Sequence, residues 1–84
     1  MKLRRGQVVR VVFYDHVSGH GKPWRCVAYG KVVGLSRRAV TIETWHGDGK
    51  QQQHISAANH EKFTIIRAAI EQIEVARQWE PVDG

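Results

Sequence analysis

The chain has 84 residues, of which 42% are hydrophobic and 25% are charged. These values are typical of one small globular domain with a single core, and they argue against a large enzyme with a cleft between domains. No stretch approaches the ~20 apolar residues of a membrane-spanning helix, so no membrane partner is expected. Cys26 is the sole cysteine, which excludes an internal disulfide and predicts a cytoplasmic protein.

Positive charge is concentrated in the first half of the sequence. Residues 1–42 contain nine Lys or Arg and one acid, whereas residues 43–84 contain four cations and seven acids. These halves therefore carry +8 and −3, which together give the net charge of +5. A basic half of this kind predicts a polyanion partner, and the predominance of Arg over Lys favours phosphate.

The first two-thirds of the chain are predicted to form strands joined by turns. Residues 7–14 are β-branched or aromatic, and residues 24–35 form a second, longer run in which Gly30 predicts a bend or bulge. Residues 39–45 alternate in polarity, so Val40 and Ile42 should face inward while Thr41, Glu43 and Trp45 face outward.

The last third of the sequence is compatible with two structures. Apolar residues at helical spacing, including Phe63, Ile66 and Ile70, would suit a helix over residues 61–79. The same segment also reads as a strand over residues 63–66, a single 3-10 turn over residues 67–70 and a strand over residues 71–77. Periodicity alone does not separate these alternatives.

The order of strands, turns and bends resembles the SH3-like small β-barrel. The resemblance covers about residues 6–77 and depends on three features: the glycines of the bent strand, the apolar-x-apolar run from Phe63 to Ile65 with its short turn ending in Ile70, and Ile73-Glu74. It implies a mainly β fold, a five-stranded barrel with a 3-10 turn before the last strand. The alternative is a three-stranded antiparallel sheet with a C-terminal helix over residues 61–79.

The predicted organisation is a single domain over residues 1–84. The ordered barrel is expected over about residues 6–78, preceded by a basic N-terminal arm at residues 1–5 and followed by a flexible tail at residues 80–84.

A second resemblance is to the plasmid-encoded type II dihydrofolate reductases, which are short SH3-like barrels. Their active-site strand has the pattern Val-Gln-Ile-Tyr, and the corresponding stretch here is Phe63-Thr64-Ile65-Ile66. Thr64 and Ile66 replace the Gln and Tyr that contact substrate, so the resemblance does not imply that activity.

Basic and aromatic residues alternate along the predicted strands. Cations neutralise phosphates and flat aromatic rings stack on bases, which together predict a nucleic-acid interface for DNA or RNA with low sequence specificity. The candidate binding residues are Arg4, Arg5, Arg10, Tyr14, Trp24, Arg25, Arg37, Arg38 and Trp45.

No catalytic, metal or cofactor site is predicted. The five histidines, His16, His20, His46, His54 and His60, lack the spacing of a closed zinc site, and no phosphate-binding Gly-rich loop is present. We therefore expect a protein that is not an enzyme and that uses no cofactor or metal.

The alternative function is a protein–protein interaction or oligomerisation module that binds an acidic partner. Trp24, Tyr29 and Trp45 could line a groove for such a partner. A homo-oligomer would use the strand ends and the outward apolar residues Val8, Val12 and Ile66.

Overall fold

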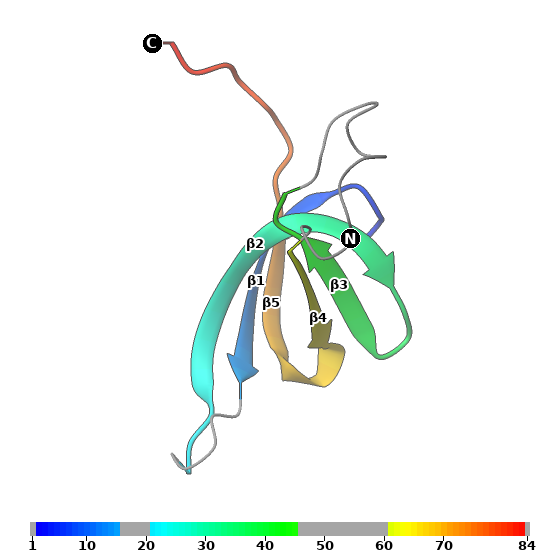
Figure 1. Ribbon diagram of the computed structural model, residues 1–84, viewed down its shortest axis with the longest axis vertical. Coiled ribbons are helices and arrows are strands. Elements are labelled where there is room, and N and C mark those ends of the chain that lie inside the picture. The colour runs from blue at the N-terminus through cyan, green and yellow to red at the C-terminus, as the bar shows by residue number, and fades with distance from the viewer. Residues whose placement is uncertain (1, 16–20, 46–60, 84) are drawn as a thin grey trace.

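The computed structural model describes residues 2–15, 21–45 and 61–83 (Figure 1). The elements are β1 (Val8–Asp15), β2 (Trp24–Leu35), β3 (Ala39–Glu43), β4 (Lys62–Ile66), the 3-10 turn η3 (Arg67–Ala69) and β5 (Ile70–Val75). No helix in this part of the chain is long and apolar enough to cross a membrane.

The five strands form one antiparallel sheet in the order β4-β3-β2-β1-β5. This arrangement confirms the mainly β prediction and the 3-10 turn before the last strand. The alternative helix over residues 61–79 is wrong, because β4, η3 and β5 occupy that segment. The sheet is curved but open, since β4 and β5 are its two edges and do not pair with each other.

The curvature of the sheet comes from β2, which is the longest strand and bends across the molecule in Figure 1. Residues 24–31 of β2 pair with β1, and residues 31–35 pair with β3, so Lys31 belongs to both ladders. At the preceding position, a Cβ on Gly30 would lie 2.8 Å from the Glu43 backbone oxygen. Glycine therefore permits the close approach of β2 and β3 at the bend.

The core lies on the inner face of this curved sheet. Its buried side chains are aliphatic and come from β1, β2, β3 and β4. They are Val9, Val11, Val32, Val40, Ile42 and Ile65. The inward orientation predicted for Val40 and Ile42 is confirmed, since both are fully buried. Leu3, Phe13, Leu35, Ile73 and Val75 are among the half-buried residues that pack against this cluster.

Two residues predicted to be exposed on the outer face are instead buried. Val12 is 5% exposed, because β2 and β5 flank it with Val27 and Gln72. Glu43 is 7% exposed and lies in the register between Lys31 of β2 and Lys62 of β4. The alternation of polar and apolar residues predicted the face of the sheet on which each side chain lies. It did not predict that side chains of the neighbouring strands would bury both residues. Val12 is therefore not available to an oligomer surface.

Candidate nucleic-acid interface

The outer face of β1 and β2 carries three of the candidate binding residues, Arg10, Tyr14 and Arg25, together with Tyr29. Arg10 of β1 pairs with Tyr29 of β2, and Tyr14 of β1 pairs with Arg25 of β2. Directly opposed residues in an antiparallel ladder share a face, so these four side chains lie on one face of the sheet. Each of these four side chains is exposed.

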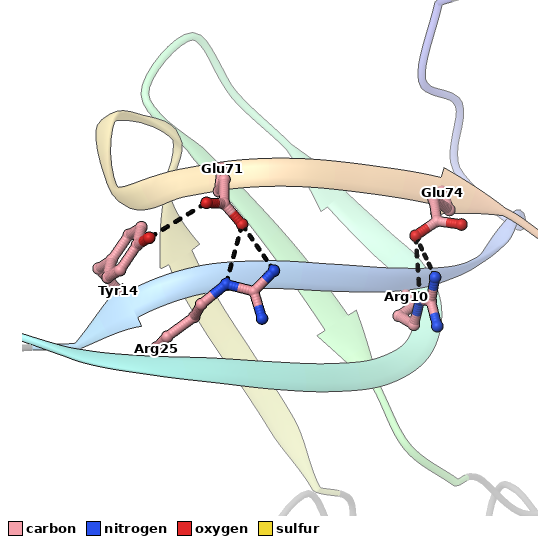
Figure 2. A network of polar contacts seen from close by, with 5 residues as sticks. All are labelled: Arg10, Tyr14, Arg25, Glu71 and Glu74. Carbon is pink, nitrogen blue, oxygen red and sulfur yellow. Dashed lines mark hydrogen bonds and ion pairs between the residues drawn. The ribbon is translucent and has the colours of Figure 1, made fainter.

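Acidic residues of β5 lie against this group (Figure 2). Arg10 forms an ion pair with Glu74, in which its Nε lies 3.0 Å from the Glu74 Oε1. The Arg25 Nε donates a hydrogen bond to the Glu71 Oε2 at 3.0 Å, and the Arg25 Nη2 forms an ion pair with the same oxygen at 2.9 Å. The Tyr14 hydroxyl donates to the other Glu71 oxygen at 3.1 Å. Two acids from the acidic half of the sequence thus neutralise two arginines from the basic half.

A β-bulge in β5 accounts for the position of Glu71. Phe13 of β1 pairs with Ile70, whereas the preceding residue Val12 pairs with Gln72, so Glu71 is one extra residue in β5. A bulge can redirect a side chain relative to the regular alternation. Here it allows the Glu71 carboxylate to reach both Tyr14 and Arg25.

These contacts shift two pKa values. Hydrogen bonds from Arg25 and then from Tyr14 hold the pKa of the Glu71 carboxyl below its usual range. The hydrogen bond to Glu74 raises the pKa of Arg10 further above its ordinary value, with smaller effects from the Glu74 charge and from Tyr29. Both ion pairs are therefore formed at neutral pH.

The depressed pKa of Glu71 makes its contribution to stability depend on pH. Because the folded-state pKa is below the unfolded-state value, the stabilisation is present above the unfolded pKa and is lost as the pH falls through the folded pKa. We expect Glu71→Gln to lower the Tm modestly at neutral pH, with the difference from wild type shrinking as the pH falls through the depressed pKa of Glu71 into the acid range. Thermal unfolding across this range measures it.

Glu80→Gln is the matched control, because Glu80 is an exposed acid in the tail beyond β5. It should leave the Tm near the wild-type value throughout. A Glu71→Gln difference of the same size at both ends of the pH range would contradict the assigned ion pair.

A second group of cations lines an open hollow at the other face of the sheet. The hollow has a volume of about 670 Å³. Its lining residues are Lys2, Leu3, Leu35, Ser36, Arg37, Arg67, Ile73 and Val75. Three are cations and none of the described lining residues is an acid, so this hollow favours an anionic ligand. We call it the cationic hollow.

The wall of the cationic hollow is fixed by hydrogen bonds between η3 and the β2–β3 turn. The Arg67 backbone N–H donates to the Arg38 carbonyl at 2.7 Å, and the Arg67 Nε donates to the Ser36 carbonyl at 2.9 Å. The Ser36 hydroxyl oxygen accepts the Ala39 backbone N–H at 3.0 Å. The turn that carries Arg37 and Arg38 is therefore held in one conformation.

The N-terminal arm is anchored beside the same hollow. The Gly6 N–H donates to the Val32 carbonyl and the Val32 N–H donates to the Gln7 carbonyl, both at 2.8 Å. Leu3 packs against the core cluster and Lys2 lines the cationic hollow. Arg4 and Arg5 follow Leu3 in the chain and both are exposed.

The two candidate tryptophans lie apart from each other. Trp24 begins β2 and pairs with Asp15, at one end of the β1–β2 ladder. Trp45 lines a separate hollow with Val8, Lys31 and other residues, at the opposite end of that ladder. Consequently, Trp24, Tyr29 and Trp45 do not line the common groove that the sequence suggested.

Four charged residues that shape these surfaces were not among the sequence candidates. Lys2 and Arg67 line the cationic hollow, while Glu71 and Glu74 neutralise the outer face. Arg67 had a local signal, since it starts the predicted 3-10 turn after a strand. The acids had none, because their partners lie 46 and 64 residues away in the sequence.

The histidines expected to remain without metal all lie outside the described residues. Within residues 2–15, 21–45 and 61–83, no cluster of three or more His, Cys, Asp or Glu could hold a metal ion. Comparisons with protein-family models, curated proteins and solved structures find no significant match to this chain.

Proposed function

We propose that this chain is a small, non-enzymatic nucleic-acid-binding protein of the SH3-like small β-barrel class. The observation that carries the proposal is the cationic hollow, in which Lys2, Arg37 and Arg67 surround an aliphatic floor without a described acid. Arg4 and Arg5 follow the lining residue Leu3 in the chain, Arg38 follows the lining residue Arg37, and all three are exposed. The lone Cys26 supports a cytoplasmic location.

Phosphate contact through the cationic hollow and the neighbouring arginines is consistent with low sequence specificity. Base sequence is read by side chains that reach base edges in a groove, usually from a helix or a β-ribbon. The described residues that line the cationic hollow are three cations, four aliphatic residues and Ser36, whose oxygens already accept hydrogen bonds within the protein. Binding should therefore depend mainly on charge and on the shape of the ligand.

The outer face is a weaker candidate for phosphate contact. Its two arginines, Arg10 and Arg25, are already paired with Glu74 and Glu71. A phosphate approaching either guanidinium would also approach a carboxylate. We therefore assign the main nucleic-acid contacts to the cationic hollow rather than to the outer face.

Fluorescence anisotropy tests the proposed function. Labelled strands of roughly 20 nucleotides, as single- and double-stranded DNA and RNA, are titrated with the protein at about 50 and 200 mM salt. We expect micromolar or tighter binding that weakens about tenfold or more over this range, because bound phosphates release counterions. No binding to any strand at the lower salt concentration would refute the proposal.

The alternative is a protein-interaction surface on the outer face, and one observation favours it. Tyr29 is 62% exposed and Val27 is 46% exposed, next to the neutralised Arg10 and Arg25. Aromatic residues and Arg are enriched in protein–protein interfaces relative to the rest of the surface. A partner bound there would keep its affinity at high salt, unlike a polyanion.

A further inference from the structure

The cationic hollow has an apolar floor as well as a charged rim. Leu3, Leu35, Ile73 and Val75 line it, and each of them also packs on the buried core cluster while remaining half-buried. Its volume of about 670 Å³ lies within the range of clefts that accept small ligands or their parts. Phosphate groups alone would leave this aliphatic floor exposed to water.

The ligand that covers both parts of the hollow carries an anion next to a flat, weakly polar body. A nucleotide has this chemistry when its base is unstacked, since the base then offers its faces and the phosphate its charge. In a duplex the base faces are covered by their neighbours, so only the phosphates could reach the rim.

We propose that the cationic hollow binds one unstacked nucleotide of a single strand, with the base on the aliphatic floor and the phosphates at the rim. This inference rests on the proposed function and names its preferred ligand. Lys2 and Arg67 contact phosphate, because both carry charge at the edge of the floor. Arg37 can do so as well, or it can lay its guanidinium plane on the base.

The floor makes such recognition tolerant of base identity. Aliphatic contacts and guanidinium stacking use the faces of a base, and every base has such faces. The polar Ser36 beside the floor is already engaged, because its carbonyl accepts Arg67 and its hydroxyl oxygen accepts Ala39. Base-edge readout by Ser36 is therefore not expected.

The aromatic residues of the outer face offer a less suitable platform for a base. The Tyr14 hydroxyl is bonded to Glu71, and Tyr29 lies beside the Arg10–Glu74 pair. A nucleotide stacked there would place its phosphates near two carboxylates. The cationic hollow meets the same requirement without such repulsion from its described lining residues.

The test compares three ligands of equal length by competition against a labelled single strand. They are an unlabelled DNA strand of about 12 nucleotides, its duplex, and a strand in which abasic residues replace every base. We expect the base-bearing strand to bind about tenfold more tightly than the abasic strand. It should also bind more tightly than the duplex, although the higher charge density of a duplex favours duplex binding electrostatically.

Two variants assign the preference to the cationic hollow. Leu3→Ala removes part of the floor from a residue that precedes β1, and Val82→Ala is the control because Val82 is 94% exposed in the tail. Leu3→Ala should reduce the affinity ratio of the base-bearing strand to the abasic strand at least about threefold. Val82→Ala should leave this ratio unchanged.

The outcomes separate this inference from the proposed function. Binding of none of the three ligands at low salt would refute both. Salt-dependent binding with equal affinity for the base-bearing and abasic strands, or with tighter duplex binding, would overturn the unstacked nucleotide alone. An undiminished preference in folded Leu3→Ala would overturn its location. If that variant does not fold, Arg37→Gln, at an exposed lining residue of the same hollow, takes its place, and undiminished affinity for the base-bearing strand would overturn the location.

Discussion

Gly30→Ala is expected to destabilise the protein by about 1–3 kcal/mol, although alanine normally stabilises a strand relative to glycine. The new Cβ would lie 2.8 Å from the Glu43 backbone oxygen and 3.2 Å from the Ile42 Cβ. A backbone carbonyl in a paired strand cannot move aside as a flexible side chain can. The β2–β3 ladder would therefore have to open where β2 changes partner.

Gly34→Ala is the matched control, because Gly34 lies in the same strand and faces the same partner strand. Its Cβ would be 3.1 Å from the Thr41 Cβ, so a shift of a few tenths of an ångström between the strands would relieve the contact. Thermal and urea unfolding should show a much larger loss for Gly30→Ala than for Gly34→Ala. Equal stability of Gly30→Ala and wild type would contradict the close approach.

The second large effect is expected on nucleic-acid binding. Arg37→Gln/Arg38→Gln should lower the salt slope of binding by up to about 2 and weaken affinity by about ten- to a hundredfold at about 0.1 M salt. Both side chains are exposed on a turn whose conformation is fixed by Ser36 and Arg67. Anisotropy titrations at several salt concentrations measure both quantities.

Arg10→Gln/Arg25→Gln provides a control with the same change in net charge. These arginines are paired with Glu74 and Glu71, so they contribute less to phosphate binding than the turn arginines. The control should retain most of the salt slope, and its Tm reports whether the fold persists. A greater loss of slope for this pair than for Arg37→Gln/Arg38→Gln would place the interface on the outer face.

Much of the fold could be predicted from local sequence signals. The bounds of β2 match the predicted strand at residues 24–35, because turn-forming residues flank an uninterrupted β-rich run. The segment after residue 61 was ambiguous because its apolar residues satisfy two periods. The structure buries Ile65 and leaves the next residue, Ile66, 62% exposed, which fits alternation in β4 and not a helical stripe. Phe63 shares the face of Ile65 but is 51% exposed, because β4 is an edge strand.

The candidate site was less predictable because its electrostatics depend on distant pairing. Arg10 and Arg25 read as part of a basic face when only their own half of the chain is considered. Pairing of β5 with β1 brings Glu74 and Glu71 to them across the sheet. An uneven distribution of charge along the sequence therefore produces a basic surface only where the fold keeps the basic half away from the acidic half.

The net charge of the outer face also depends on whether β5 has docked on β1 during folding. The β1–β2 hairpin and β3 are synthesised well before β5, and domains dominated by contacts between distant segments fold slowly. Arg10 and Arg25 consequently remain without Glu74 and Glu71 until the last strand docks on β1. A chain in which β1 and β2 are paired before β5 docks would thus carry a second cationic surface, which the completed sheet removes.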